Sequence, residues 1–274
     1  MFIRSMLFAP GTKVSVMEKA LRSDADTIII DLEDSVAINM KETVRGNVVE
    51  FLKNQKEMKN KVYVRINSWD SPWGKVDLDE ILALPVRGIM LPKAENASQL
   101  EEVAVLLPDD VELVPLIESA KGVLNALEIA QVKKVSRLAF GAVDFTLDIN
   151  TALSKTGREL LVSRSYLVLV SRSAGILPPI DTVYPDIHDA EGLQKELEEI
   201  KCLGMGGKLL IHPKQIPITH QAFTPSEEEI AHYKKITAAF EEAERQGVAA
   251  VQVDGKMVDY PVYLQAIKKL DMIL

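Results

Sequence analysis

Carboxylate side chains recur in this sequence directly after short apolar runs. One run leads into Asp31-Leu-Glu33-Asp34, another ends at Ile117 and leads into Glu118, and Asp144 follows Phe140-Gly-Ala-Val. Carboxylates that converge in one cleft repel one another unless a cation lies between them. No histidine pair or thiolate set accompanies these carboxylates. The oxygen-only set therefore indicates a hard divalent ion such as Mg²⁺ rather than zinc.

Each candidate residue also has a purely structural interpretation. Glu118 could cap the next helix, Asp144 could close an Asx turn, and the segment from Asp31 to Asp34 could be a solvated turn. Arg65, near the end of the third apolar run, could form a surface ion pair, although its place at a strand end favours a site residue. His212 is more typical of a packed loop residue than of a base.

Short apolar runs alternate with amphipathic segments along most of the chain. Runs that do not strictly alternate with polar residues are typical of strands covered on both faces. Regular alternation of strands and helices predicts a parallel sheet, and eight repeats favour a closed (β/α)₈ TIM barrel, an α/β fold. Function gathers at the carboxyl ends of barrel strands, where the candidate residues fall. The eight runs are Ser5–Ala9, Thr27–Leu32, Val62–Ile66, Gly88–Leu91, Glu112–Ile117, Arg137–Gly141, Pro179–Val183 and Lys208–His212.

Local signals mark several element boundaries. Ser98 with Glu101 predicts a capping box, and Gly175 lies where a helix end favours glycine. One helix is predicted over residues 122–129, and residues 140–144 are predicted to form a turn.

A C-terminal helix–hairpin–helix follows the eighth run. Thr224-Pro-Ser-Glu-Glu-Glu229 predicts a helix start, and this helix is expected to stop at Gly247. A hairpin over residues 248–258, turning at Asp254-Gly255, and a helix over residues 262–270 complete the chain.

The length and net charge of the chain limit its possible domain organisation and partners. We expect a barrel domain over residues 1–223 and an extension over residues 224–274. The net charge of −8 argues against nucleic acid or an anionic membrane as the main partner. No apolar run approaches the roughly 20 residues that span a bilayer. The single cysteine, Cys202, has no expected catalytic role and fits a reducing cytoplasm, where we expect the protein to act.

Ten segments, taken in order, match the motifs of one enzyme family. They are Arg4-Ser-Met-Leu-Phe-Ala-Pro-Gly11, Lys19-Ala20, Asp31-Leu-Glu-Asp-Ser-Val36, Val64-Arg-Ile-Asn67, Leu91-Pro-Lys93, Ile117-Glu-Ser-Ala-Lys-Gly122, Phe140-Gly-Ala-Val-Asp144, Gly206-Gly-Lys208, Ile211-His-Pro-Lys-Gln215 and Asp254-Gly-Lys-Met-Val-Asp-Tyr-Pro261. By these segments the sequence resembles the citrate lyase beta-subunit family, within the HpcH/HpaI group of barrel aldolases and lyases that includes malyl-CoA and citramalyl-CoA lyases.

The resemblance implies a metal site. Glu118 and Asp144 would ligate Mg²⁺, with substrate oxygens and waters at its other positions, so that Glu118 would also lie against the substrate. Asp31, Glu33 and Asp34 would hold metal-bound waters from outside the direct ligands.

The resemblance also implies a substrate site. Arg65 would clamp the substrate carboxylate, because a guanidinium group can donate to two oxygens at once. Phe8, Lys19 and the segment around His212 would line the path of a CoA-like thioester arm. Asp259 matches a general acid/base that reaches the site from a neighbouring subunit. The extension would therefore serve oligomerisation and complete the active site, and a homo-oligomer, commonly a trimer in the family, is expected.

The implied activity is Mg²⁺-dependent carbon–carbon cleavage of a citryl-, citramalyl- or malyl-type 3-hydroxyacyl thioester. The products would be an oxo acid and an acetyl or other acyl thioester, carried on CoA or on an acyl-carrier protein. Two alternatives remain: a stand-alone malate-synthase-like or thioesterase-like enzyme acting on CoA thioesters, and a non-catalytic subunit of a lyase complex. One departure bears on the acyl group: Asp148-Ile-Asn150 replaces an Asp-Leu-Gly-like triplet, and Asn150 can adopt the left-handed conformation of glycine.

Overall fold

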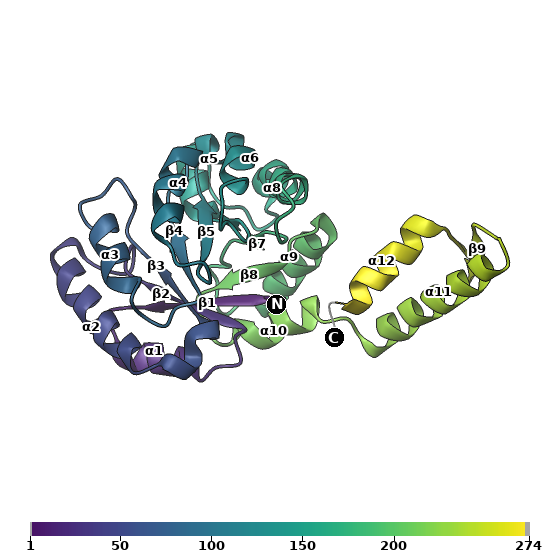
Figure 1. The fold of residues 1–274 in the computed structure, drawn as a ribbon, viewed down its shortest axis with the longest axis horizontal. Coiled ribbons are helices and arrows are strands. Elements are labelled where there is room, and N and C mark those ends of the chain that lie inside the picture. Colours follow the sequence, from purple (N-terminus) through teal and green to yellow (C-terminus); the bar gives the residue numbers. More distant parts are fainter. Residues whose placement is uncertain (1, 272–274) are drawn as a thin grey trace. The chain divides into compact units, whose positions relative to one another are not determined.

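Eight parallel strands close into a barrel in the computed structural model, which describes residues 2–271 (Figure 1). Each strand pairs with the next along the chain, and β1 pairs with β8 to close the ring. The predicted TIM barrel is thereby confirmed. The strands are β1 (Ser5–Pro10), β2 (Thr27–Asp31), β3 (Val62–Arg65), β4 (Gly88–Leu91), β5 (Glu112–Ile117), β6 (Ala139–Phe140), β7 (Ile180–Asp181) and β8 (Gly207–Leu210).

Helices lie around the outside of the barrel, between successive strands and after the last one (Figure 1). They are α1 (Val14–Leu21), α2 (Lys41–Lys53), α3 (Gly74–Ile81), α4 (Ala97–Leu106), α5 (Ala120–Leu124), α6 (Ala126–Ala130), α7 (Ala142–Asp148), α8 (Leu161–Ser173), α9 (Ala190–Leu203) and α10 (Gln215–Phe223). Among the described residues, no helix is long and apolar enough to cross a membrane.

The strands bury side chains on both faces. In β2, Ile29 packs with Met6 and Tyr63 inside the barrel, while Ile28 and Ile30 belong to the larger core between the barrel and its helices. Successive side chains of a strand point to opposite faces, so a strand buried on both sides needs an unbroken apolar run. This requirement explains why the strands were recognisable in the sequence.

Several local predictions differ from the structure. The predicted Ser98–Glu101 capping box is wrong: Asn96 caps α4, and its side chain accepts a hydrogen bond from the Gln99 backbone N–H. The helix predicted over 122–129 is two short helices, α5 and α6, and the turn predicted to contain Asp144 is the first part of α7. Gly175 follows α8 with a φ of +74°, as predicted for a helix end.

The chain forms two compact units, and the first comprises residues 3–220. The second unit follows it in the sequence. Within it, α11 (Glu227–Arg245) begins with a capping box between Ser226 and Glu229, and Gly247 follows the helix with a φ of +75°. The strands β9 (Val251–Val253) and β10 (Lys256–Val258) form the predicted hairpin, and α12 (Tyr260–Asp271) completes the unit. The proposed role of this unit in oligomerisation stays a prediction.

Candidate active site

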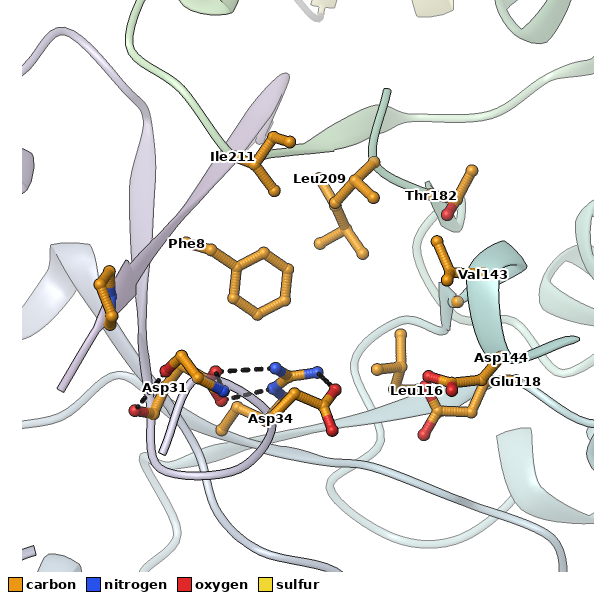
Figure 2. Close-up of a pocket in the computed structure, with 15 residues that line it drawn as sticks. Phe8, Asp31, Asp34, Leu116, Glu118, Val143, Asp144, Thr182, Leu209 and Ile211 are labelled. Atoms are coloured by element: carbon orange, nitrogen blue, oxygen red, sulfur yellow. Dashed lines mark hydrogen bonds and ion pairs between the residues drawn. The ribbon is translucent and has the colours of Figure 1, made fainter. Parts of the chain in front are cut away.

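A cavity of about 620 Å³ opens at the carboxyl ends of the barrel strands (Figure 2). Phe8 and Pro10 of β1 contribute to its wall, as do residues at or just after the ends of β2, β3, β5, β6, β7 and β8. This is the end of the barrel at which the sequence analysis placed the candidate residues. The lining residues are Phe8, Pro10, Asp31, Asp34, Ser35, Arg65, Leu116, Glu118, Gly141, Val143, Asp144, Thr182, Val183, Leu209 and Ile211.

Arg65 lies at the centre of an acidic cluster in this cavity. The register of β2 and β3 places Asp31 beside Arg65, and the guanidinium group donates to both Asp31 oxygens, Nε at 2.7 Å and Nη2 at 2.8 Å. The Nη1 atom donates to Asp34 at 3.1 Å and lies 3.3 Å from Glu33. The guanidinium carbon also lies 4.8 Å from the centre of the Phe8 ring, a cation–π contact. The side chain is thus fixed in plane and direction.

The Arg65–Asp31 pair favours the charged state of both groups. Burial disfavours ionisation of Asp31, but the hydrogen bonds and charge of Arg65 outweigh burial and lower the pKa of that carboxyl. For Arg65 too, burial disfavours the charge, yet the hydrogen bond and charge of Asp31 prevail, so the pKa of the guanidinium group is raised. Pairing through two hydrogen bonds also fixes the orientation of the Arg65 guanidinium group relative to the Asp31 carboxylate.

The acidic turn after β2 is held by its own backbone and by two distant side chains. Asp31 accepts hydrogen bonds from the backbone N–H groups of Glu33 (2.9 Å) and Ser35 (3.0 Å). Lys41 donates its ammonium group to the carbonyl oxygens of Leu32 (3.0 Å) and Glu33 (2.7 Å). Asn67 donates to the same Leu32 carbonyl at 3.0 Å. The backbone of the Asp31–Asp34 segment is therefore held in place by several hydrogen bonds, and the role of the segment in the site stays a prediction.

Glu33 is buried between two cations. Its Oε2 atom lies 3.3 Å from Arg65 Nη1, and its Oε1 atom lies 3.2 Å from Lys93 Nζ. Among residues 2–271, neither oxygen has a partner within hydrogen-bond geometry. Burial raises the pKa of Glu33 by more than the Arg65 charge lowers it. The structure places Glu33 against these two side chains, and its role in holding metal-bound water stays a prediction.

Glu118 and Asp144 line the cavity beside each other (Figure 2). Glu118 follows β5 directly, and its Oε1 atom accepts a 2.7 Å hydrogen bond from the backbone N–H of Lys93. Asp144 lies in the first turn of α7, and Thr182 anchors the start of that helix by accepting a 2.9 Å hydrogen bond from the Ala142 N–H. Within the described chain, no residue donates a hydrogen bond to Glu118 Oε2 or to the Asp144 carboxylate.

The two carboxylates repel each other in the absence of a cation. Burial raises the pKa of Glu118 to about 8, and the charges of Glu33 and then Asp144 add to the rise. Glu118 Oε2 and Asp144 offer oxygen ligands that accept no hydrogen bond from the described chain, and a hard divalent ion between them would relieve the repulsion. In the part of the chain that the structure describes, no group of three or more histidine, cysteine, aspartate or glutamate side chains is arranged to hold a metal ion. A two-carboxylate site would leave the other positions to water and substrate.

Two candidate residues of the barrel unit, Lys19 and His212, do not line the cavity, and a third candidate, Asp259, belongs to the second unit. Lys19 is on the exposed side of α1, and His212 is half-buried after β8, with its Nδ1 atom accepting a hydrogen bond from the Lys214 N–H at 3.2 Å. Asp259 belongs to the C-terminal unit, where its side chain accepts a 3.2 Å hydrogen bond from the Val262 N–H at the start of α12. Their proposed roles stay predictions.

Several residues that shape the site were not predicted from the sequence. Lys41 and Thr182 act through hydrogen bonds to segments distant in sequence, and no local pattern announces them. Gly141 lies against Glu118, and the sequence pointed to it only as part of the segment Phe140-Gly-Ala-Val-Asp144.

The closed barrel and the acidic cavity together define a TIM-barrel protein whose site lies at the carboxyl ends of the strands. The HpcH/HpaI aldolase/citrate lyase family matches residues 4–213, and the chain therefore belongs to that family. This membership confirms the resemblance inferred from the ten segments.

Individual relatives extend the likeness over nearly the whole chain. The citrate lyase subunit beta of Leuconostoc mesenteroides subsp. cremoris is 35% identical, over 96% of this chain and 90% of that protein. The (3S)-malyl-CoA thioesterase of Cereibacter sphaeroides (strain ATCC 17023) is 37% identical, over 93% of this chain and 89% of that protein. Protein CitE from Mycobacterium tuberculosis, solved in complex with magnesium, acetoacetate and coenzyme A, is 30% identical with a TM-score of 0.85, and 98% of this chain and 97% of that chain are covered.

Proposed function

We propose that this protein is a Mg²⁺-dependent carbon–carbon lyase that cleaves a 3-hydroxyacyl thioester into an oxo acid and an acyl thioester. The observation that carries the proposal is the pair of carboxylates, Glu118 and Asp144, in one cavity with Arg65, with only one of the Glu118 oxygens accepting a hydrogen bond from the described chain. A relative of this chain has been solved with magnesium and coenzyme A, which supports both the metal and the thioester carrier. The acyl group is of the citryl, citramalyl or malyl type.

The residues of the cavity fit the demands of this cleavage. The hydroxyl group must lose its proton, the carbon–carbon bond then breaks to give the oxo acid, and the thioester enolate left behind must be protonated on carbon. A bound Mg²⁺ would lower the pKa of the hydroxyl group and stabilise the developing negative charge. Glu118 and Asp144 would hold the ion, and Arg65 would orient the substrate carboxylate against it. Asp259, contributed by the C-terminal unit of a neighbouring subunit, would act as the general acid/base, accepting the proton from the hydroxyl group and returning a proton to the enolate carbon.

The metal assignment is tested by substituting Glu118. Titration with Mg²⁺, followed by turnover of citramalyl-CoA, malyl-CoA and citryl-CoA, should show metal-dependent cleavage of at least one thioester by the unmodified protein. Glu118→Ala should abolish the Mg²⁺-dependent activity while the protein stays folded. Full Mg²⁺-dependent activity in Glu118→Ala would overturn the assignment.

A thioesterase is the second candidate, favoured by the 37% identity to a (3S)-malyl-CoA thioesterase. Hydrolysis of the thioester releases the free CoA thiol together with a hydroxy acid, whereas the lyase reaction releases an oxo acid and keeps the thioester intact. A thiol reagent added during turnover separates the two reactions. Binding of CoA thioesters without turnover would instead indicate a non-catalytic subunit, and comparison of CoA with acyl-carrier-protein substrates identifies the carrier.

A further inference from the structure

Lys93 has a strained backbone at the edge of the candidate metal site. It follows β4 in the segment Leu91-Pro92-Lys93 and has a φ of +53°. Residues other than glycine, asparagine and aspartate rarely adopt this left-handed conformation, because the β carbon approaches the backbone too closely. Strain of this kind persists where surrounding contacts enforce it, and it concentrates at functional sites.

Contacts between the segment after β4 and the segment after β5 enforce this conformation. The Ala94 N–H donates to the Leu116 carbonyl at 3.2 Å, Asn125 donates to the Glu95 carbonyl at 2.8 Å, and Ser119 donates to the Glu95 side chain at 2.9 Å. A β carbon at Gly122 would lie 2.6 Å from the Ala94 carbonyl oxygen, so the two segments touch without an intervening side chain. The backbone around Lys93 is thus locked to the segment that carries Glu118.

The strained backbone directs one N–H group at a single atom. The angle φ sets the direction of a residue's N–H relative to the chain that follows it, and the Lys93 N–H donates to Glu118 Oε1 at 2.7 Å. The other oxygen, Oε2, then faces Gly141, where an added β carbon would lie 2.7 Å away. One oxygen of Glu118 is therefore occupied by the backbone, and the other is left for a ligand.

The Lys93 side chain is expected to weaken cation binding, whereas the Lys93 backbone N–H is expected to support it. Its ammonium group lies 3.2 Å from Glu33 Oε1. Burial lowers the pKa of that ammonium group, but the charge and hydrogen bond of Glu33, followed by the charges of Asp34 and Glu118, raise it above the usual value. A positive charge close to Glu118 disfavours a second cation at the same carboxylate. The backbone and the ammonium group of one residue therefore have opposite expected effects on a bound cation.

We infer that Lys93 is a positioning residue for the cation site, and that it acts through its left-handed backbone N–H rather than through its charge. The inference rests on the proposed function, in which Glu118 is a metal ligand. Asparagine tolerates positive φ but lacks the ammonium group, whereas the branched β carbon of valine opposes positive φ. Lys93→Asn and Lys93→Val both remove the charge, and they differ in the backbone conformation that they allow.

The probe is Mn²⁺ in place of Mg²⁺, measured by electron paramagnetic resonance without substrate, so that the readout does not depend on activity. Lys93→Asn should bind Mn²⁺ at least as tightly as the unmodified protein. Lys93→Val should bind about 10–100-fold more weakly than Lys93→Asn, the usual effect of losing a hydrogen bond that orients a ligand. The matched control is Lys134, which has a φ of +72° in the turn before β6, at the opposite end of the strands from the cavity. Lys134→Val should leave Mn²⁺ binding unchanged.

The outcomes separate the inference from the proposed function. Equal affinity of Lys93→Asn and Lys93→Val for Mn²⁺ would overturn the positioning role, and so would an equal loss in Lys134→Val. Unchanged Mn²⁺ binding by Glu118→Ala would instead overturn the metal assignment itself. Thermal unfolding checks that each variant folds. Lys93→Ala, which lacks the branched β carbon, replaces Lys93→Val if the latter does not fold, with Mn²⁺ affinity again expected below that of Lys93→Asn.

Discussion

The Glu118 carboxylate occupies the space that any side chain at position 141 would need. A β carbon built on Gly141 would lie 2.7 Å from Glu118 Oε2 and 2.8 Å from Glu118 Cβ. The φ of Gly141 is −106°, which other residues also adopt, so the need for glycine here is one of space. The pair links the end of β6 to the end of β5 at the oxygen that we assign to the metal.

Gly141→Ala should displace the Glu118 carboxylate and weaken metal binding. We expect a loss of about 1–3 kcal/mol in the free energy of unfolding, typical of overpacking, together with an increased Mg²⁺ requirement for turnover. Gly46→Ala is the matched control, because Gly46 lies inside α2 and an added β carbon there has no heavy atom within 4 Å. That variant should keep its Mg²⁺ requirement and gain slightly in stability. An unchanged Mg²⁺ requirement in Gly141→Ala would contradict the arrangement.

The raised pKa of Glu118 predicts a pH-dependent stability. Burial and the neighbouring carboxylates raise this pKa from 4.5 to about 8, so the folded protein keeps a proton that the unfolded chain releases. Without metal, this group should therefore lower the free energy of unfolding as pH rises from 4.5 to about 8, while added Mg²⁺ should stabilise most at the upper end. Glu118→Gln should remove this contribution. Parallel curves of melting temperature against pH for the two proteins would contradict the assignment.

Much of the fold was predictable because the strands are buried on both faces and so form unbroken apolar runs. The helix boundaries that depend on competing local interactions were not predictable. Asn96 caps α4 although Ser98 is also a good capping residue, because Ser98 donates its own hydroxyl to Asn96. The seven-residue helix α7 begins directly after Gly141, and because glycine is typical of turns, the sequence predicted a turn there instead of a helix. Asn150 does have the left-handed backbone inferred for it, with a φ of +56°.

The sequence predicted only those site residues that lie at or just after the end of a strand. The register of β2 and β3 brings Asp31 and Arg65 together, and both were recognisable as charged residues near the ends of apolar runs. The position of Glu118 depends instead on a hydrogen bond from the Lys93 backbone N–H and on the absence of a side chain at Gly141. Neither a backbone direction nor a missing side chain leaves a periodic signal in the sequence.

Arg65→Lys should impair catalysis more than folding. Lysine keeps the charge but cannot donate to both Asp31 oxygens, so the cation loses its fixed direction. We expect kcat/KM to fall about 10²-fold, as misplaced groups commonly cause. Arg87→Lys is the control, because Arg87 also donates through two nitrogens to a carboxylate, Glu112, and lies 5.8 Å from the centre of the Tyr63 ring. A similar fall in kcat/KM for both variants would point to a general structural effect.

Asp259→Asn separates catalysis from helix capping. Asparagine can still accept the hydrogen bond from the Val262 N–H, so the melting temperature should change little. Loss of the acid should lower kcat by about 10²–10⁴-fold. If Asp259 acts across a subunit interface, mixing inactive Asp259→Asn subunits with inactive Arg65→Ala subunits should restore part of the activity. No recovery in verified mixed oligomers would count against a role across the interface.

The central claim is that the cavity performs Mg²⁺-dependent carbon–carbon cleavage. Its most direct test is a product balance with citramalyl-CoA, malyl-CoA and citryl-CoA, in which the oxo acid, the acyl-CoA and the free CoA thiol are all quantified with Mg²⁺ and after chelation. We predict equal amounts of oxo acid and acyl-CoA from at least one substrate, no free thiol, and no reaction after chelation. A hydroxy acid with an equal amount of free thiol, or product formation that persists after chelation, would contradict the claim.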